Sequence, residues 1–276
     1  MRHTGLSLKH VGLIALLGLG LTACFVLENT YSVIPPGPWR GILKLDQNPV
    51  TPNPRGEPLP EKVGLQFEEV TEGQLPFNFE VTYVNADSLI LTLQNATEQI
   101  VVQDMVYGRN RATGDDTIRF FFPQSDGTYI RAMYAGGVIE GEWIPRAGAE
   151  MGIPFVAYHG KSHRFTELRK PPIQDLSGRW SLTAGLDTDS TYFGTLILTQ
   201  QGNDLTGVWE SEAVQCAHLQ GTIQEDKAYL SYFNGQEALL IEAKVTETET
   251  LIGSLRNGDQ YRTIWEAQRN GRTPAQ

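Results

Sequence analysis

Two short runs, Phe193-Gly-Thr-Leu-Ile-Leu-Thr-Gln200 and Asp204-Leu-Thr-Gly-Val-Trp-Glu210, flank the turn Gln201-Gly-Asn203 and decide the fold class. Each run has the length of a β-strand and is rich in residues that favour strands. A three-residue connection that contains glycine joins neighbouring antiparallel strands. The stretch therefore predicts a β-hairpin. Because the same pattern recurs along the chain, we expect an all-β protein.

Residues 172–270 repeat the hairpin pattern and form the second of two predicted domains. The region follows the break Arg169-Lys-Pro-Pro172, and Gly178-Arg-Trp180 opens its first strand. The strands expected after Trp180 are Phe193–Gln200, Asp204–Glu210, Ala217–Gln224, Lys227–Phe233, Ala238–Thr246, Thr250–Leu255 and Gln260–Gln268. Connections this short favour an antiparallel meander or half-barrel. Residues 271–276 are interpreted as a tail or the start of a linker.

Residues 38–168 form the first predicted domain, another antiparallel meander or half-barrel. Gln47–Lys62 holds five prolines and is expected to be a stiff surface loop, with a partner-binding loop as the alternative. The expected strands are Trp39–Leu45, Val63–Val70, Phe77–Val84, Ser88–Asn95, Gln99–Val106, Thr117–Phe122, Gly127–Tyr134, Gly137–Ile144 and Ile153–His159. So many short strands are enough to curl into a barrel or half-barrel.

An internal echo suggests that the two regions are copies of one plan. Ile139-Glu-Gly-Glu-Trp143 resembles Leu205-Thr-Gly-Val-Trp209, and each follows a turn. Gly37-Pro-Trp39 and Gly178-Arg-Trp180 open the two regions in the same way. The alternative is that apolar-x-Gly-x-Trp simply suits any well-packed hairpin.

The N-terminus predicts a lipid anchor. A basic start and an apolar run, Val11 to Leu21, make residues 1–23 a signal peptide, because the run is too short to span a bilayer. Leu21-Thr-Ala-Cys24 then resembles the lipobox of bacterial lipoproteins. The resemblance implies lipidation of Cys24, which would anchor the protein to a membrane through several acyl chains. Residues 24–37 are interpreted as a lipidated tether.

The sequence also indicates a compartment and excludes one class of partner. Phe25 follows the cysteine where aspartate would signal retention in the inner membrane, so we expect the cell envelope, at the outer membrane facing the periplasm. The formal charge of the chain is −10. Nucleic-acid binding needs clustered Lys and Arg, so an acidic chain argues against it.

No constellation of residues predicts catalysis, a metal or a cofactor. Cys216 would be the single thiol left after lipidation, and we interpret it as a buried core residue. His159 and His163 lack a third metal ligand at a telling spacing, and His218 is isolated. The remaining groups are solvated carboxylates or serines without the context of a nucleophile: Glu68-Glu69, Asp115-Asp116, Asp187, Asp189, Ser177 and Ser211.

Five tryptophans are the remaining candidate site residues, as core aromatics or as contacts for a ligand: Trp39, Trp143, Trp180, Trp209 and Trp265. Gly178-x-Trp180 at a first strand resembles the opening of lipocalin-like barrels. That resemblance implies a small apolar ligand held in the mouth of a barrel.

The order of motifs resembles the long N-terminal β region of TlpA/ResA-like thiol-disulfide oxidoreductase lipoproteins. The motifs span nearly the whole chain after Cys24: Gly37-Pro-Trp-Arg-Gly41, Leu75-Pro-Phe-Asn-Phe79, Gly114-Asp-Asp116, Ile118-Arg-Phe-Phe-Phe-Pro123, Gly141-Glu-Trp143, Ile153-Pro-Phe-Val-Ala157, Ser177-Gly-Arg-Trp180, Gly202-Asn-Asp-Leu-Thr-Gly207, Ser231-Tyr-Phe-Asn-Gly235 and Trp265-Glu-Ala-Gln-Arg-Asn270. In that family a thioredoxin-like domain with Trp-Cys-x-x-Cys follows. No residue here matches that active site, so the resemblance implies no catalytic residue.

We therefore expect a non-catalytic binding or scaffolding module of the envelope, related to the accessory region of TlpA-like reductases. Its partners would be the membrane, through the lipid on Cys24, and an envelope protein or a small apolar ligand. Two alternatives stay open. The first is a lipocalin-like carrier of a small apolar ligand. The second is a fragment of a TlpA-like reductase whose thioredoxin domain is missing.

Overall fold

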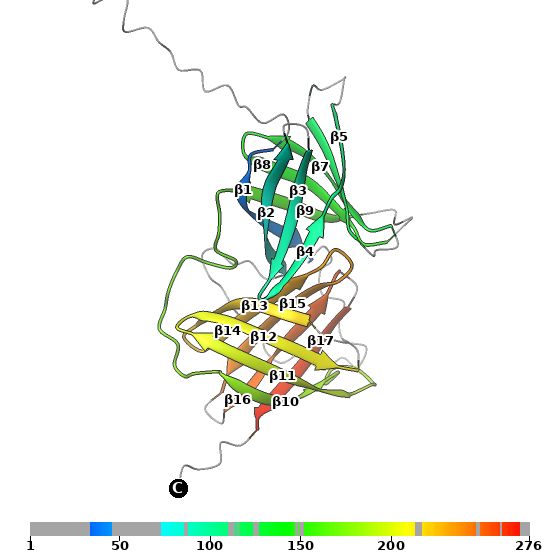
Figure 1. Ribbon diagram of the computed structural model, residues 1–276. Helices are drawn as coiled ribbons and strands as arrows, with labels where there is room; N and C mark the ends of the chain where they lie inside the picture. Colours follow the sequence, from blue (N-terminus) through cyan, green and yellow to red (C-terminus); the bar gives the residue numbers. More distant parts are fainter. Residues whose placement is uncertain are drawn as a thin grey trace, which may run out of the picture. The chain divides into compact units, whose positions relative to one another are not determined.

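Two antiparallel sheets make up the fold of the computed structural model (Figure 1). The structure describes residues 34–45, 73–85, 88–109, 114, 116–123, 127–146, 149, 152–212, 217–246, 249–259 and 261–270. The described residues contain strands, turns and bends but no helix, which confirms the all-β prediction. Both sheets belong to one compact unit.

Nine strands form the first sheet: β1 Gly37–Lys44, β2 Gln74–Asn85, β3 Ser88–Asn95, β4 Glu98–Val102, β5 Asp104–Arg109, β6 Asp116–Phe121, β7 Tyr129–Ala135, β8 Val138–Ile144 and β9 Ile153–His159. Eight form a closed barrel: β10 Gly178–Ala184, β11 Tyr192–Gln201, β12 Asp204–Ser211, β13 Ala217–Gln224, β14 Lys227–Phe233, β15 Ala238–Val245, β16 Thr250–Asn257 and β17 Tyr261–Arg269. The predicted strand Val63–Val70 and the predicted proline-rich loop Gln47–Lys62 lie outside the described residues. Residues 1–33 and 271–276 also lie outside them.

The closed barrel is an up-and-down meander whose first strand pairs with its last. β10 pairs with β11 on one side and with β17 on the other, and each strand from β11 to β16 pairs with its two neighbours in sequence. The opening hairpin of the sequence is β11–β12, with Gln201 opposite Asp204. Alternate residues face inward because side chains alternate across a strand. In β10 these are Trp180, Leu182 and Ala184.

One strand of the first sheet differs from its prediction and explains how the sheet curls. The run Gln99–Val106 was expected to be a single strand, but it breaks at Gln103 into β4 and β5. β4 pairs with β3 and β5 pairs with β6, so these consecutive strands are the two edges of the sheet. Because one residue joins the edges, the sheet is nearly closed. If β4 and β5 are counted as two halves of one strand, the first sheet has eight strands, as the closed barrel has.

The two sheets complete their cores differently. The core of the closed barrel consists of its own residues and Leu176 just before β10. The core of the first sheet also includes four residues from the outer face of the barrel, namely Tyr229, Phe233, Ala238 and Leu240. The Phe233 ring lies 4.4 Å from Phe77 and 5.3 Å from Trp143 between centroids. Phe233 is therefore a barrel residue that fills the core of the first sheet.

The two openings noted in the sequence have the same local structure. Gly37 and Gly178 both have positive φ, +107° and +135°, which a side chain would disfavour. Two residues later, the Trp39 indole N–H donates to the Pro35 carbonyl at 3.1 Å, and the Trp180 indole donates to the Leu176 carbonyl at 3.0 Å. Each bond spans four residues, so the two strands begin identically.

A basic side chain from the last strand lies against each of these tryptophans. His159 of β9 is the register partner of Trp39, and their rings lie 5.0 Å apart. Arg269 of β17 is the register partner of Trp180, with its guanidinium 4.6 Å from the Trp180 ring. Such repetition in the tertiary structure supports the interpretation that the two regions share one plan.

Candidate functional site

The connecting segment, residues 160–177, joins β9 to β10 and makes hydrogen bonds to both sheets. Its first part is bound to the first sheet. Arg40 of β1 donates from Nε to the Arg164 carbonyl at 2.7 Å and from Nη2 to the Phe165 carbonyl at 3.0 Å. Asn78 of β2 donates to the Ser162 carbonyl at 3.2 Å. These bonds satisfy backbone groups that a strand would otherwise pair.

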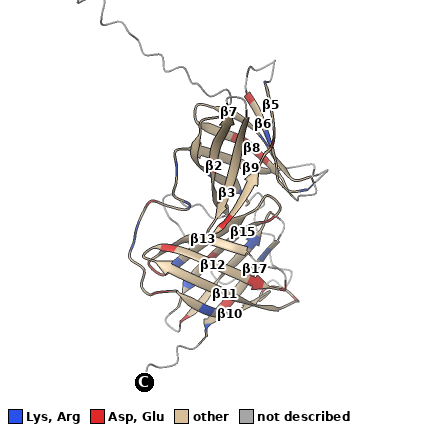
Figure 2. Ribbon diagram, in the orientation of Figure 1, with Lys and Arg blue, Asp and Glu red and all other residues tan. Residues whose placement is uncertain are grey.

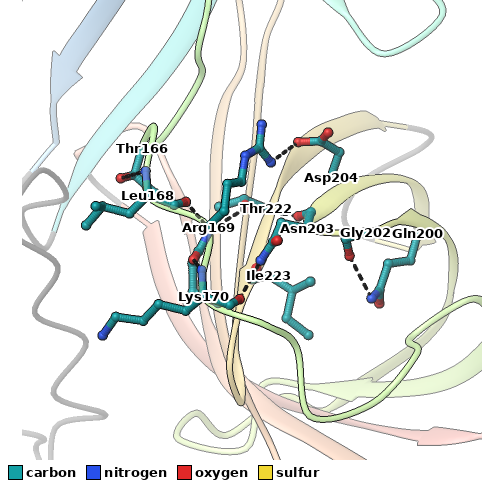
Figure 3. A network of polar contacts seen from close by, with 11 residues as sticks. Thr166, Leu168, Arg169, Lys170, Gln200, Gly202, Asn203, Asp204, Thr222 and Ile223 are labelled. Carbon is teal, nitrogen blue, oxygen red and sulfur yellow. Dashed lines mark hydrogen bonds and ion pairs between the residues drawn. The ribbon is translucent and has the colours of Figure 1, made fainter.

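The second part of the segment is bound to the barrel by side-chain amides (Figure 3). Gln224 donates to the Leu168 carbonyl at 2.8 Å and accepts from the Lys170 amide at 2.7 Å. Asn203 donates to the Lys170 carbonyl at 2.6 Å. The break predicted at Arg169–Pro172 is thus an ordered connection with specific bonds to the β11–β12 turn and to β13.

Arg164 lies at the centre of the segment and joins both sheets. Its guanidinium makes five hydrogen bonds, all to neutral acceptors. In the barrel it donates to the Ser231 hydroxyl at 2.7 Å, the Ser231 carbonyl at 3.3 Å and Gln220 Oε1 at 3.1 Å. In the first sheet it donates to the Gln94 carbonyl at 2.8 Å and Asn95 Oδ1 at 3.0 Å. A guanidinium has five N–H donors, so all of them are used.

The charge of Arg164 has no carboxylate partner among the described residues. The side chain is 6% exposed. Burial lowers its pKa from the ordinary 12.5 to about 9, so the group remains charged at neutral pH. A buried cation without a counter-ion is expensive. The five hydrogen bonds offset part of this cost in free energy, but because their acceptors are neutral they do not compensate the charge.

A cleft of about 250 Å³ lies beside Arg164, between the connecting segment and the barrel strands β12 and β13. An ion pair and a histidine–carboxylate contact border it. Arg169 Nη1 lies 2.5 Å from Asp204 Oδ1 (Figure 3), and His163 Nδ1 lies 2.9 Å from Glu167 Oε1. Its polar wall is made of hydroxyls and one amide: Ser162, Thr166, Thr206, Thr222 and Gln220.

A second cavity, the β5–β8 groove, is a shallow depression of about 740 Å³ on the first sheet. Three consecutive residues from each of β5, β6, β7 and β8 line it. The middle residues of these triplets are register partners across the sheet: Tyr107, Ile118, Ala132 and Gly141. Val106 and Met133 are exposed large apolar residues in this groove. The groove therefore offers apolar surface that a partner could cover.

All five tryptophans are core residues. Trp39, Trp180, Trp209 and Trp265 are 0% exposed and Trp143 is 1% exposed. Trp180, Trp209 and Trp265 fill the closed barrel, where the rings of Trp209 and Trp265 meet edge to face at 5.3 Å. The sequence left open whether the tryptophans are core aromatics or contacts for a ligand, and in the structure all five lie in the core.

The remaining candidates are separate from one another. His159 Nε2 lies 2.9 Å from the Pro36 carbonyl, whereas His163 is paired with Glu167, and His218 lies on β13. Among the described residues no group of three or more His, Cys, Asp or Glu side chains could hold a metal. Asp187 caps a turn by accepting from the Ile264 amide at 2.8 Å.

The two serines are structural. The Ser177 hydroxyl donates to Asp175 at 2.7 Å, and the Ser211 hydroxyl accepts from the Trp209 indole at 3.2 Å. Cys24, Cys216, Asp115 and Glu68-Glu69 lie outside the described residues. In the part of the chain that is described, no helix has the length and apolar character needed to cross a membrane.

Sequence reasoning missed Arg164 as an organising residue. The positions that accept its hydrogen bonds lie 56 to 70 residues away in the chain. Local pattern carries no signal over such separations. The one local hint is the cluster of basic and polar residues from His159 to Arg164, which by itself indicates only a strand end and a turn.

Comparison with known proteins adds little. No family model and no curated protein matches the chain. Among solved structures, a DUF3598-family protein of unknown function from Nostoc punctiforme is similar, with 14% identity and a TM-score of 0.23. The match covers 85% of this chain and 96% of the other. A similarity at this level carries no inference about function.

Proposed function

We propose that this protein is a lipid-anchored, non-catalytic binding and scaffolding protein of the cell envelope. The observation that best supports a scaffolding role is the core of the closed barrel, where three tryptophans and many aliphatic side chains are buried. Lipocalin-like carriage in that barrel would need free volume around Trp180. The outer surfaces are then the places where the protein can act.

The β5–β8 groove is the surface that best suits an envelope protein partner. Val106 is 52% exposed and Met133 is 47% exposed, although both are apolar. The Arg131–Glu142 ion pair at 2.6 Å lies beside them. Apolar anchors next to polar residues are typical of interfaces. Among the described residues, basic and acidic positions are interspersed along the strands of both sheets (Figure 2).

A test combines the anchor with the groove. A photo-crosslinking residue at position 106 should give one discrete adduct in envelope membranes, whereas the same residue at Thr183 on the outer face of β10 should not. Cys24→Ala should remove the protein from the membrane fraction and abolish the adduct. An unchanged fractionation of Cys24→Ala, or equal adducts from both positions, would contradict the proposal.

A second candidate function is a carrier of a small apolar ligand in the first sheet. The observation that favours it is the seam between β4 and β5, where Tyr83, Met105 and Tyr107 are only partly buried against the core. Native mass spectrometry after mild extraction tests this candidate. A carrier retains a bound mass that Met105→Glu removes, and a scaffold retains none.

The relation to the accessory region of TlpA-like reductases stays a prediction. In our proposal the chain itself has no redox activity, since no residue matches the Trp-Cys-x-x-Cys site. An insulin-reduction assay should show no turnover above the uncatalysed rate. Clear turnover by the purified chain would favour the reductase alternative.

A further inference from the structure

The cleft beside Arg164 has an uncompensated positive charge. At its border the charge of Arg169 is paired with that of Asp204, and the Glu167 carboxylate, which contacts His163, is exposed, so water screens its charge. Arg164 is buried next to the cleft and donates only to neutral oxygens. Its charge acts through protein rather than through water, so it is screened weakly. The field in the cleft therefore favours an anion.

The wall of the cleft holds donors that no described residue uses. Ser162 and Thr206 both line the cleft, and neither hydroxyl makes a hydrogen bond within the described part of the chain. Gln220 also lines it and is held in place by its bond to Arg164. Arg169 adds a guanidinium at the border, and guanidinium groups match the geometry of carboxylates and phosphates.

We propose that this cleft binds a small oxyanion, the carboxylate or phosphate group of a small molecule. Arg169 and the hydroxyls of Ser162 and Thr206 would donate to the anion. Arg164, whose N–H groups are all occupied, would contribute its charge. A volume of about 250 Å³ admits a compact ligand and excludes a folded partner.

This site goes beyond the proposed scaffolding role, which needs no small ligand. An anion bound there would contact the connecting segment and the barrel together. Anything that binds the native state and not the unfolded chain stabilises it by mass action. The ligand would therefore strengthen the connection between the two sheets.

Isothermal titration of the full mature chain tests the site, with inorganic phosphate and succinate as separate probes at constant ionic strength. Saturable heat is expected from at least one probe, and which probe gives it tells phosphate from carboxylate recognition. Arg169→Gln should weaken binding about tenfold, since it removes one charge-assisted donor. Asp204→Asn should tighten binding, because it removes the carboxylate that repels the anion.

The two variants break the same exposed ion pair, so a purely structural effect would move both affinities in one direction. Thr206→Val keeps the shape and the strand preference of the side chain and should weaken binding severalfold. Thr183→Val, the matched change on β10, should leave it unchanged. The absence of saturable heat with either probe, or a shift of the same sign in Arg169→Gln and Asp204→Asn, would overturn the proposal. Neither result bears on membrane anchoring or on crosslinking at the groove.

Discussion

The first sheet and the closed barrel begin in the same way but become stable in different ways. Each opens with Gly-x-Trp, an indole bonded to a carbonyl four residues earlier, and a basic residue from the last strand. The barrel then closes through the pairing of β10 with β17 and fills its interior with its own side chains. The first sheet splits its closing strand at Gln103 and takes part of its core from the barrel.

The difference shows that two sheets with similar strand arrangements can differ in how much each depends on the other for its stability. A closed barrel has no unpaired edge and needs no outside contribution. A split strand leaves two edges, and the core of the first sheet is not completed by its own residues alone. Phe233 packs on Phe77 of β2, and Arg164 bonds to Asn95 at the end of β3. We therefore expect the barrel to support the first sheet, and four predictions test this dependence.

Separating the two regions should have the largest effect. The fragment 170–276 should unfold cooperatively, because its core cluster is complete within it. The fragment 24–168 should show no cooperative thermal transition, because Phe77 and Trp143 lose their contact with Phe233. Circular dichroism during heating measures both. Cooperative unfolding of the first fragment alone would show that the borrowed residues are dispensable.

Removing the Arg164 hub should have the next largest effect. Arg164→Gln leaves several buried acceptors unsatisfied in both sheets, and each such group costs about 1–3 kcal/mol. Relief from burying the charge offsets part of this, so we expect a loss of about 2–4 kcal/mol in the free energy of unfolding. The matched control is Arg119→Gln at the exposed position of β6, which should cost less than about 0.5 kcal/mol. Urea denaturation measures both, and equal midpoints would contradict the role of Arg164.

A smaller effect should separate two turn glycines of the barrel. Gly235 and Gly258 both have positive φ, so an alanine at either position costs about 1 kcal/mol. A methyl group at Gly235 would also overlap the Phe122 ring of the first sheet, whereas the same group at Gly258 meets nothing within 4 Å. Gly235→Ala should therefore be the more destabilising by about 1–3 kcal/mol. If thermal melts give equal shifts, the turn at Gly235 does not pack on the first sheet.

The smallest effect is expected at alkaline pH. Burial, followed by the nearby Glu98 carboxylate, raises the pKa of Tyr232 in the barrel to about 12, and burial with the nearby Tyr83 does the same for Tyr107 at the seam. Unfolded tyrosine ionises near pH 10. Between about pH 10 and 12 the folded chain therefore holds more protons than the unfolded chain, so stability should fall as the pH rises.

Substitution of either tyrosine by phenylalanine should reduce this alkaline loss. The comparison of Tyr232→Phe with Tyr107→Phe shows which sheet limits stability in that range. Chemical denaturation at a series of pH values from 8 to 12 measures it. An unchanged slope in both variants would mean that other groups cause the loss.

Much of the local structure could be predicted because its causes are local. Strand ends at Asn95, Gln224, Phe233 and His159 agree with the sequence, since glycine, asparagine and alternation act over a few residues. The tryptophan openings were recognisable for the same reason. The break at Gln103 is not evident from the sequence, because neither Gln103 nor Asp104 is a glycine or proline that would signal a turn, and only the pairing on opposite sides separates β4 from β5.

The sequence by itself determined that this protein is all-β, where its hairpins turn and which tryptophans open the two regions. Turn chemistry and side-chain alternation fix these features within one or two strands. The tertiary structure alone decided that one sheet closes, that the other borrows Phe233, and that Arg164 joins them. These features depend on contacts between distant residues, such as the bond from Asn95 to the Phe233 carbonyl across 138 positions. Only the folded chain brings such groups within hydrogen-bonding distance.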